Sequence, residues 1–346
     1  MALDRNNLVT LGKTVGHAKP TSTVAYSFGE DKYSYKDLND TFRNELNELV
    51  GTYALYRENK NVLFALMEEV ITDVLPVKVM EQYGQFAEVK TYGQGVRPVF
   101  TQKITENSKR RAKQFVTKVG LAGRYEVFKL DGRSYEVTTS AYGAACQIGI
   151  EEFLDGRVDF ATLLDLVMQG LDDKIYMEIA NALIGTVDTL QPANKYSGNA
   201  FIEEEMDALL QVADSYGSGN STIYCTFEFA SKMIPANEWR SDRMKDEMWR
   251  NGYLTNYKNH QVVVLRQSFV DERNEEKVID PSYAWIIPGG AEKPIKIAFE
   301  GETLMKEVES QDEWSRDLQF YKKIGVAAIV YNDICVYRNE SLTKER

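Results

Sequence analysis

The stretch KITENSKRRAKQFVTKVGLAGR, residues 103–124, comes shortly before DFATLLDLVMQGLDDKIYMEIANALIG, residues 159–185. The first stretch holds seven basic residues and one acid, a charge of +6, in a chain of net charge −11. Residues 151–188 hold nine acids and two bases, a charge of −7. A long polar segment cannot bury a core of its own, so it needs another surface to bind. Because a second copy of the chain carries the opposite charge, the two stretches predict a self-assembling protein.

Residues 159–184 predict one long amphipathic helix. Apolar side chains recur every three or four residues, as on one helical face: Phe160, Leu164, Val167, Leu171, Ile175 and Ile179. Asp159 is a plausible N-cap and Gly185 ends the pattern. At ~1.5 Å per residue the helix spans about 37 Å. The other faces carry acids that we expect to contact a neighbouring subunit: Asp165, Asp172, Asp173 and Glu178.

Residues 84–142 predict an extended β-loop. Strands are expected over 86–92 and 96–104, with a turn at Gly93-Gln94-Gly95, and an Asp131-Gly132 pair indicates a hairpin. An ordinary surface hairpin is the alternative, but some 55 residues with few core positions are long for one. The candidate inter-subunit contacts of this loop are its basic residues: Lys103, Lys109, Arg110, Arg111 and Lys113.

Residues 1–36 are polar and show no helical period, which predicts an extended arm, with a disordered tail as the alternative. Asp37 or Asp40 is expected to cap a helix that runs to Tyr53. A second helix is expected over residues 62–74, with Pro76 as its stop.

Residues 195–346 predict a mixed region of helices and strands. Helices are expected over 201–213, 226–234 and 239–249, and strands over 221–225, 260–266, 283–288 and 294–300. Two last strands, 318–330 and 334–337, are expected about a turn at Asn332-Asp333.

Composition excludes several classes of protein. The 346 residues contain no run of 18 apolar residues, so no membrane partner is expected, and the first twenty residues do not form a signal peptide. Three cysteines, Cys146, Cys225 and Cys335, lie far apart and predict free thiols in a reducing compartment. A net charge of −11 disfavours tight binding of nucleic acid over the whole surface.

Catalytic constellations are scarce. The only histidines are His17 and His260, and both are more simply interpreted as surface polar residues than as members of a nucleophilic site. No HExxH, paired CxxC or GxxxxGK[ST] motif occurs. Adjacent acids such as Asp172-Asp173 splay around a helix and indicate a solvated face rather than a metal site. We therefore expect no catalytic, cofactor or metal site, and an α/β enzyme is the disfavoured rival.

The order of these parts resembles the major capsid proteins of tailed phages, whose α+β fold is the Hong Kong 97 type. YKKIGVAAIVYNDICVYR, residues 321–338, and GYLTNYKNHQVVVL, residues 252–265, are the segments most similar to that family. The resemblance implies six regions: N-arm 1–36, peripheral-domain helices 37–83, extended β-loop 84–142, peripheral domain with spine helix 143–194, axial domain 195–311 and C-terminal peripheral-domain strands 312–346.

The resemblance also implies a function. It is that of a major head protein of a tailed double-stranded DNA bacteriophage, which self-assembles into hexamers and pentamers of an icosahedral shell enclosing the genome. Such a protein is a structural virion component, assembled in the host cytoplasm, with scaffolding, portal and decoration proteins as further candidate partners. Packaged DNA would be contacted weakly, through residues such as Arg5, Lys13 and Lys19.

Two family properties remain open at this point. An encapsulin, a cellular shell of the same fold, is the alternative function; encapsulins typically begin with a helix, which the pattern of residues 1–36 does not predict. Some relatives form Lys–Asn cross-links, for which Lys103, Lys109, Lys113, Lys118 and Asn332 would be candidates. That chemistry also needs a buried carboxylate to take a proton, and the sequence places none.

Overall fold

The structure is a computed structural model of the chain. It describes residues 5–17, 26–28, 31–102, 132–147, 160–216, 219–234, 241–269, 271, 273, 275–289, 292–309, 316–329 and 333–343. The chain divides into two compact units. Unit 1 comprises residues 1–98, 137–175 and 297–326, and unit 2 comprises 99–136, 176–296 and 327–346.

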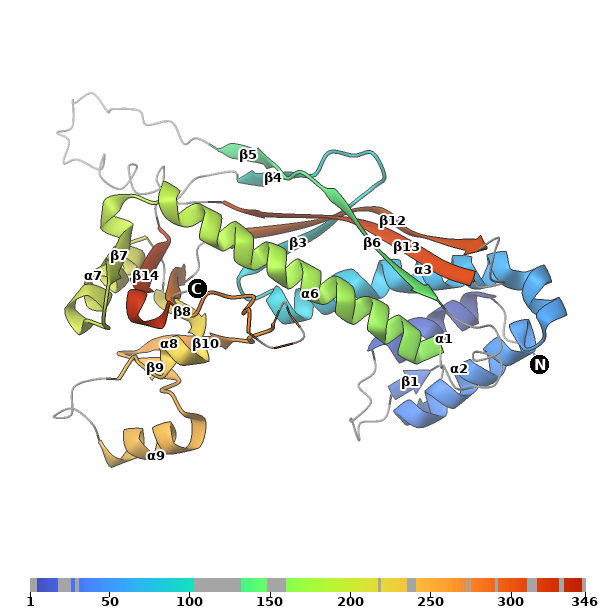
Figure 1. The fold of residues 1–346 in the computed structure, drawn as a ribbon, viewed down its shortest axis with the longest axis horizontal. Coiled ribbons are helices and arrows are strands. Elements are labelled where there is room, and N and C mark those ends of the chain that lie inside the picture. The colour runs from blue at the N-terminus through green and yellow to red at the C-terminus, as the bar shows by residue number, and fades with distance from the viewer. Residues whose placement is uncertain are drawn as a thin grey trace, which may run out of the picture. The chain divides into compact units, whose positions relative to one another are not determined.

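Unit 1 begins with three helices: α1 (Arg5–His17), α2 (Tyr35–Val50) and α3 (Tyr53–Tyr83). They pack on one another, and a short antiparallel pair, β1 (Tyr26–Phe28) and β2 (Asp31–Tyr33), stands between α1 and α2 in the chain (Figure 1). The N-cap of α2 is Ser34, which forms a capping box with Asp37. The expected cap at Asp37 or Asp40 was therefore wrong, because Asp37 is the third helical residue that completes the box.

Residues 5–17 correct the expectation of an extended N-terminal arm. They form α1, and Leu8, Val9, Leu11 and Val15 are buried. Gly12 and Gly16 allow the helix to approach α3 closely, since a Cβ on Gly12 would lie 2.9 Å from Val70 Cγ2 and one on Gly16 would lie 3.2 Å from Val74 Cγ2. These two glycines occupy positions on the buried face, which is why the apolar period was not recognised.

Pro76 does not stop the second helix, contrary to expectation. Helix α3 runs through it from Tyr53 to Tyr83. A proline inside a helix removes one backbone hydrogen bond and costs roughly 3 kcal/mol. Here Val74, Leu75 and Val79 are all at most 1% exposed, so burial on both sides of the proline keeps the helix continuous.

A four-stranded sheet completes unit 1. Its order is β3 (Ala87–Tyr92), β12 (Ile295–Glu309), β13 (Arg316–Ala328) and β6 (Ser140–Gln147). Strands β13 and β6 are antiparallel, with Tyr321 opposite Gly143. A Cβ on Gly143 would lie 2.7 Å from the carbonyl oxygen of Phe320, so only glycine fits this close approach of the two strands.

The long helix predicted over 159–184 is present as α6 (Phe160–Thr186). Its described apolar positions Leu171, Ile175, Ile179 and Leu183 are buried, as their spacing predicted. Gly185 lies one residue inside the helix end, and Asp159 lies outside the described residues. Helix α6 belongs to unit 1 up to Ile175 and to unit 2 from Tyr176.

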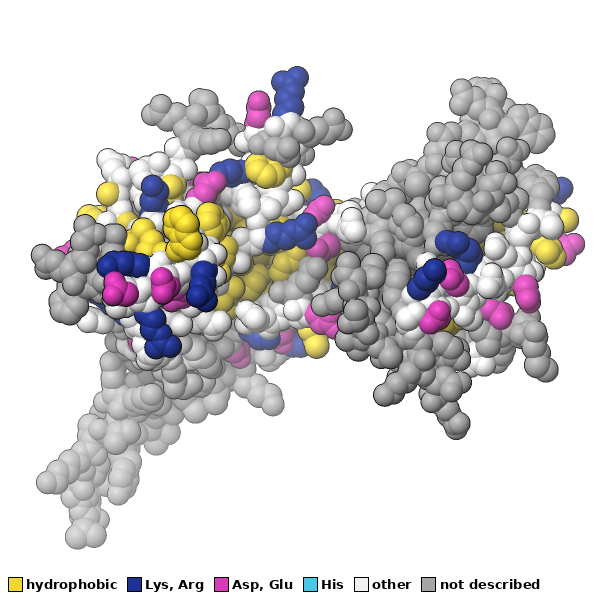
Figure 2. All heavy atoms as spheres, turned by 90° about the horizontal axis from the view of Figure 1, so that it is seen from below, with side chains coloured by type: hydrophobic (Ala, Val, Ile, Leu, Met, Phe, Trp, Pro, Cys, Tyr) yellow, Lys and Arg dark blue, Asp and Glu magenta, His cyan; other side chains and the backbone are white. Residues whose placement is uncertain are grey.

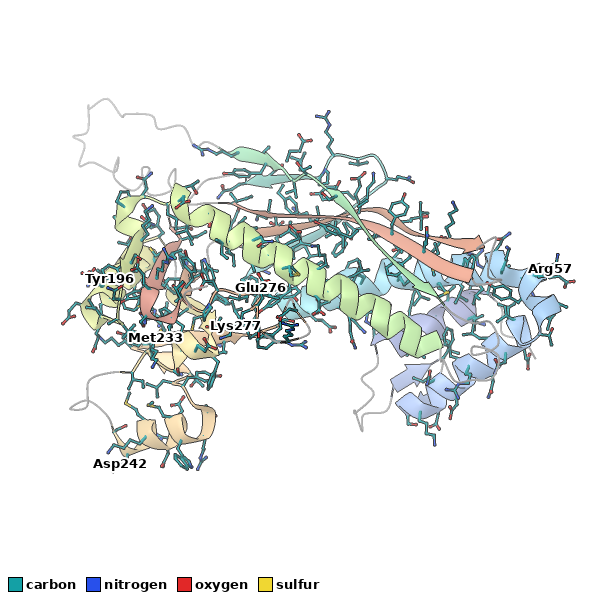
Figure 3. The ribbon with its side chains drawn as sticks, viewed as in Figure 1. Arg57, Tyr196, Met233, Asp242, Glu276 and Lys277 are labelled. Atoms are coloured by element: carbon teal, nitrogen blue, oxygen red, sulfur yellow. The ribbon has the colours of Figure 1, made fainter. Side chains whose placement is uncertain are left out.

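Unit 2 is built on a six-stranded sheet. The order is β7 (Lys195–Gly198), β14 (Cys335–Asn339), β11 (Tyr283–Gly289), β8 (Gly219–Thr226), β10 (His260–Leu265) and β9 (Asn256–Tyr257). Helix α7 (Glu203–Asp214) packs on it, and the core includes Met206, Ile223, Phe229, Met233 and Tyr337. Met233 and Tyr196 are labelled in Figure 3. Helices α8 (Phe227–Ala230) and α9 (Asp242–Asn251) follow β8, and strands β4 (Val99–Gln102) and β5 (Arg133–Glu136) pair separately.

The last two strands differ from the expected pair about a turn. Strand β13 lies in the four-stranded sheet and β14 lies between β7 and β11 in the six-stranded sheet. Burial explains the separation, because β14 places Cys335 and Tyr337, both 0% exposed, in the core beneath α7. Asn332 lies outside the described residues. The six regional boundaries implied by the resemblance remain predictions.

Candidate assembly sites

The extended loop is fixed to unit 1 at its root by one carboxylate. Glu300 on β12 is 7% exposed. Its Oε1 accepts hydrogen bonds from the Gly95 amide, at 3.2 Å, and from the Lys323 ammonium, at 3.0 Å. Its Oε2 accepts a hydrogen bond from the Thr139 hydroxyl. Glu300 therefore joins the outgoing end of the loop, its returning end and strand β13.

The backbone around Glu300 is shaped to make these bonds. The turn predicted at Gly93-Gln94-Gly95 is present, with a hydrogen bond from Val96 N to Gly93 O of 3.1 Å. Gly95 has φ +77°, in the left-handed region that favours glycine. The two ends of the loop also bond to each other, since Val137 N donates to Pro98 O at 3.0 Å.

The electrostatics of Glu300 suit an anchor. Hydrogen bonds from Thr139 and Lys323 hold the pKa of its carboxyl below the ordinary value. The group is therefore an ionised acceptor that three donors already occupy. Cross-linking chemistry needs a buried carboxylate that can take a proton. Glu300 is buried, but its carboxylate is ionised and forms an ion pair with Lys323, so it is poorly suited to take a proton.

Next to this anchor lies a buried lysine. Lys322 is 0% exposed, and its Nζ donates a 2.6 Å hydrogen bond to the Gly301 carbonyl. Burial lowers the pKa of Lys322 to about 8, although Glu302 and Asp73 act in the opposite direction. Adjacent lysines on β13 thus have different roles, since Lys323 forms an ion pair and Lys322 lies inside the unit.

Strand β12 is also hydrogen-bonded to helix α3. Thr303 N donates to Thr72 Oγ1 at 2.9 Å, and Met305 N donates to Glu68 Oε1 at 2.6 Å. These bonds satisfy backbone donors of β12 with side chains of the helix. The loop root is therefore connected through β12 to the long helix α3.

The predicted inter-subunit residues are described only in part. Lys103, Lys109, Arg110, Arg111 and Lys113 lie outside the described residues. Asp165 lies on α6, and its side chain is not among those described. Asp172 is half-buried and accepts a 3.1 Å hydrogen bond from Tyr83 Oη, so it already binds α3 of its own chain. Asp173 is exposed and Glu178 is half-buried.

The basic residues expected to contact DNA also have partners within the chain. Lys13 Nζ lies 2.5 Å from Asp73 and 3.6 Å from Glu69, and Arg5 lies 3.8 Å from Glu69. Asp73 raises the pKa of Lys13. These pairs hold α1 on α3, so Arg5 and Lys13 are not the free basic residues of an extended arm. Lys19 lies outside the described residues.

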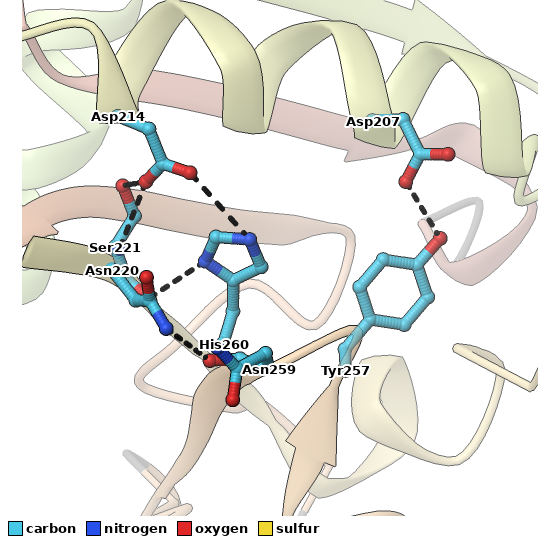
Figure 4. Close-up of polar contacts among 7 residues, drawn as sticks. All are labelled: Asp207, Asp214, Asn220, Ser221, Tyr257, Asn259 and His260. Carbon is cyan, nitrogen blue, oxygen red and sulfur yellow. Dashed lines mark hydrogen bonds and ion pairs between the residues drawn. The ribbon is translucent and has the colours of Figure 1, made fainter.

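The second histidine belongs to a polar cluster at the end of α7 (Figure 4). Asp214 Oδ1 accepts from Ser221 N at 2.9 Å and from Ser221 Oγ at 2.5 Å, and Oδ2 lies 3.6 Å from His260 Nε2. His260 Nδ1 lies 3.2 Å from the Ser221 carbonyl. In a nucleophilic triad the histidine lies between serine and aspartate. Here the aspartate lies between them, so the cluster ties α7 to β8 and β10.

A tight turn beside this cluster carries a further ion pair. Lys258 and Asn259 have φ +45° and +73°, as a two-residue hairpin turn between β9 and β10 requires. Lys258 Nζ lies 2.6 Å from Glu203 and 2.5 Å from Asp207 on α7. Tyr257 Oη also donates to Asp207, at 3.4 Å (Figure 4). These contacts fix the β9–β10 edge of the sheet against α7.

Within the described ranges, no group of three or more His, Cys, Asp or Glu residues is placed to hold a metal ion. None of the helices described there combines the length and the apolar character needed to cross a bilayer. Both cysteines whose side chains are described, Cys225 and Cys335, are buried and free.

Glu300 and Lys322 were not singled out from the sequence. Each is a charged residue within a mostly apolar strand that holds one further charge, Lys296 in PIKIAFE and Lys323 in YKKIGVAA. A charge in such a strand predicts a buried, hydrogen-bonded group, which is the signal that could have identified them. Their partners could not have been identified, because Gly95, Thr139 and Lys323 are far apart in the chain.

Comparison with known families supplies the identity of this architecture. Residues 11–336 match the family model described as SPbeta prophage-derived putative capsid protein YonB. The chain belongs to the YonB family of capsid proteins. The predicted capsid function and the phage resemblance are thereby confirmed, and the family assignment makes the chain a virion component. No curated protein sequence matches it significantly.

Solved structures similar to this YonB-family chain include phage heads and a cellular shell. The head protein of Helicobacter pylori bacteriophage KHP40 is 13% identical, with TM-score 0.47, over 74% of this chain and 90% of its own. A chain from Mycobacterium phage Che8 is 9% identical, with TM-score 0.42, over 70% of this chain and 84% of its own. The encapsulin of Synechococcus elongatus is 8% identical, with TM-score 0.42, over 74% and 87%. The family match therefore decides between phage and encapsulin.

Proposed function

We propose that this YonB-family protein is the major capsid protein of a tailed double-stranded DNA phage or prophage. Copies of the chain form hexamers and pentamers, which close into an icosahedral shell around the genome in the host cytoplasm. The observation that carries the proposal is the family match over residues 11–336. Scaffolding, portal and decoration proteins are the further partners we propose.

The test is assembly of the purified chain. Expression followed by electron microscopy and sedimentation is expected to give rings or closed shells. A chain that stays a monomer across a range of salt, crowding and protein concentrations contradicts the proposal. If the purified protein needs a scaffolding protein, co-expression of the neighbouring phage genes supplies it.

The argument that the N-terminus made against an encapsulin no longer holds. Helix α1 exists, so the absence of an N-terminal helix no longer separates this chain from encapsulins. The prophage-derived family supports the phage function instead. Isolation of shells that contain DNA supports the proposal, whereas shells filled with a cargo enzyme favour the alternative.

We further propose that the basic part of the extended loop, Lys103 with Lys109–Lys113, lies on the acidic face of α6 in the next subunit. Charges of +6 and −7 on the two stretches support this pairing. Asp173, which is exposed, and Glu178 are the described acids that we assign to the contact, and Asp172 accepts a hydrogen bond from Tyr83 of its own chain.

A further inference from the structure

Helix α9 stands apart from the core of unit 2. None of its residues is buried, and Trp249 is 91% exposed. Asp242, labelled in Figure 3, begins the helix. Figure 2 shows apolar side chains gathered on this face of unit 2, with basic and acidic side chains beside them. An exposed tryptophan on a helix with no buried residue indicates a surface that is covered by another molecule.

The helix is nevertheless well formed, with a cap at both ends. Ser241 Oγ caps the first turn by accepting from Met244 N at 3.3 Å. Gly252 ends the helix with φ +77° and donates to Met248 O at 2.8 Å. Glu247 accepts a 2.8 Å hydrogen bond from Thr255 N. The exposure of Trp249 is therefore a property of an ordered helix, which limits the entropy lost on binding.

A second exposed aromatic group lies at the C-terminal end of α9, against Gly252. Phe227 is 50% exposed and makes an edge contact with Tyr253, with ring centroids 6.1 Å apart. Its ring lies so close to Gly252 that a Cβ there would be 2.6 Å away. We call Trp249, Phe227, Met244 and Met248 the α9 patch. Aromatic residues, methionine and arginine are the types enriched at protein interfaces.

Two arginines border the α9 patch. Arg243 and Arg250 are seven residues apart, and so lie on one face of the helix. Both are exposed, and neither forms an ion pair within the part of the chain that the structure describes. Arginine and tryptophan together are the residues most often found at binding hot spots. The partner surface therefore has to supply apolar area and negative charge.

Unit 2 carries such a surface at the start of α7. Ile202 is 39% exposed, and Glu204 and Glu205 are exposed and form no ion pair with any other residue that the structure describes. Their neighbours Glu203 and Asp207 differ, because both are bound by Lys258. An apolar residue beside two unpaired acids complements the α9 patch in both charge and character.

We propose that the α9 patch binds the start of α7 on a second copy of this chain. This inference rests on the proposed capsid function, which requires copies to associate. The two surfaces differ from each other, so the contact is head-to-tail, and repeated contacts of this type close into a ring when their rotation is a whole fraction of a turn, as the proposed hexamers and pentamers require. It adds to the extended-loop contact a second interface within each hexamer or pentamer.

The first test compares two aromatic truncations in unit 2. Trp249→Ala is expected to leave the unfolding midpoint unchanged, because the ring contacts little in the subunit, and to lower the fraction sedimenting as rings or shells at least tenfold. Phe269→Ala removes another ring, 41% exposed, and is expected to assemble like the wild type. Normal assembly of Trp249→Ala while the wild type forms shells overturns this inference alone. Absence of shells from the wild type overturns the proposed function.

The second test identifies the occupant directly. A photoreactive benzoylphenylalanine at position 249 is expected to give a covalent dimer whose adduct maps to the peptide that holds Glu204 and Glu205. An adduct with another protein, or with a different part of the chain, overturns the inference. Glu204→Lys with Glu205→Lys is expected to block assembly, and adding Arg243→Glu with Arg250→Glu is expected to restore it. Failure of this restoration overturns the assigned pairing.

Discussion

The ammonium nitrogen of Lys323 on β13 lies 3.0 Å from Oε1 of Glu300 on β12, and the same carboxylate binds the two ends of the extended loop. The role of this contact can be tested by comparing a variant that removes the Glu300 charge with a control variant that leaves it in place. Because Gly95 and Thr139 bind the same carboxylate as Lys323, a change at Glu300 reaches the loop root as well as the sheet. Stability of the loop root is therefore linked to one ionised group.

The first prediction concerns Glu300→Gln. The amide keeps the shape of the side chain but loses the charge that Lys323 and the Gly95 amide bind, so hydrogen exchange at Gly95 and Val96 is expected to be faster. Glu302→Gln, an exposed neighbour on the same strand, is the matched control. Equal exchange at Gly95 in Glu300→Gln and the wild type argues against the anchoring role.

Low pH is expected to reduce the stability that Glu300 contributes. The pKa of Glu300 is lower in the folded protein than its ordinary value, so its contribution to stability is full above the ordinary value and declines as pH falls through the folded value. Urea unfolding of the wild type between pH 3 and 6 is expected to show this loss, and Glu300→Gln is expected to show less of it. Identical pH profiles contradict the prediction.

Lys322 gives a prediction of opposite sign. Its pKa is about 8 in the folded protein and 10.5 ordinarily, so between these values the unfolded chain holds a proton that the folded chain has lost. Stability from this group therefore rises as pH increases from 8 to 10.5 and is lowest below pH 8. Lys322→Met is expected to raise the free energy of unfolding at pH 7 by on the order of 2 kcal/mol.

The control for Lys322→Met is the same exchange at Lys306, which is exposed on β12. It is expected to leave both the stability at pH 7 and its dependence on pH unchanged. A Lys322→Met variant that is less stable than the wild type at pH 7, or that keeps the rise in stability above pH 8, contradicts the burial of a charge at this position.

The docking of α1 is tested at Gly12. A larger side chain there meets Val70, whose Cγ2 lies 2.9 Å from the position of a Cβ. Gly12→Leu is expected to destabilise the unit by about 1–3 kcal/mol and to expose residues 1–20 to protease. Thr10→Ala, on an exposed position of the same helix, is expected to change neither. An unaltered digestion pattern for Gly12→Leu contradicts close packing of α1 on α3.

Elements with strong local patterns were predictable from the sequence. Helix α6 follows from apolar residues at helical spacing, and its C-terminal end lies within two residues of the predicted Ile184. The turn at Gly93-Gln94-Gly95 follows from glycine chemistry. Helix α1 was not predicted because Gly12 and Gly16, which carry no apolar side chain, occupy its buried face. Their role is to let α1 approach α3 closely, and that contact is not visible in the local sequence. Burial also overrides the local preference of Pro76.

The candidate sites, too, were predictable only where the signal is local in the sequence. Charge segregation indicated two oppositely charged stretches without knowledge of the fold. The Glu300 anchor joins residues 95, 139, 300 and 323, and no local pattern relates positions so far apart. Asp172 has the sequence signature of an exposed helical acid, yet its partner Tyr83 lies 89 positions earlier. Long-range contacts of this kind depend on tertiary packing and not on spacing.

The contact between the extended loop and α6 gives the last prediction. Reversal of Lys109, Arg110 and Arg111 to Glu is expected to leave the subunit folded and to reduce shell formation, because like charges then face Asp173 and Glu178 of the neighbour. One exposed pair contributes only about 0–1 kcal/mol and is screened by salt. Repetition around a closed ring makes the summed effect measurable by sedimentation and electron microscopy. Adding Asp173→Lys and Glu178→Lys is expected to restore shells.

The control reverses three exposed lysines elsewhere, Lys36, Lys195 and Lys232, and so matches the change in net charge. Normal assembly of the loop variant at every salt concentration contradicts the contact, and equal loss of shells in the control attributes the effect to net charge alone.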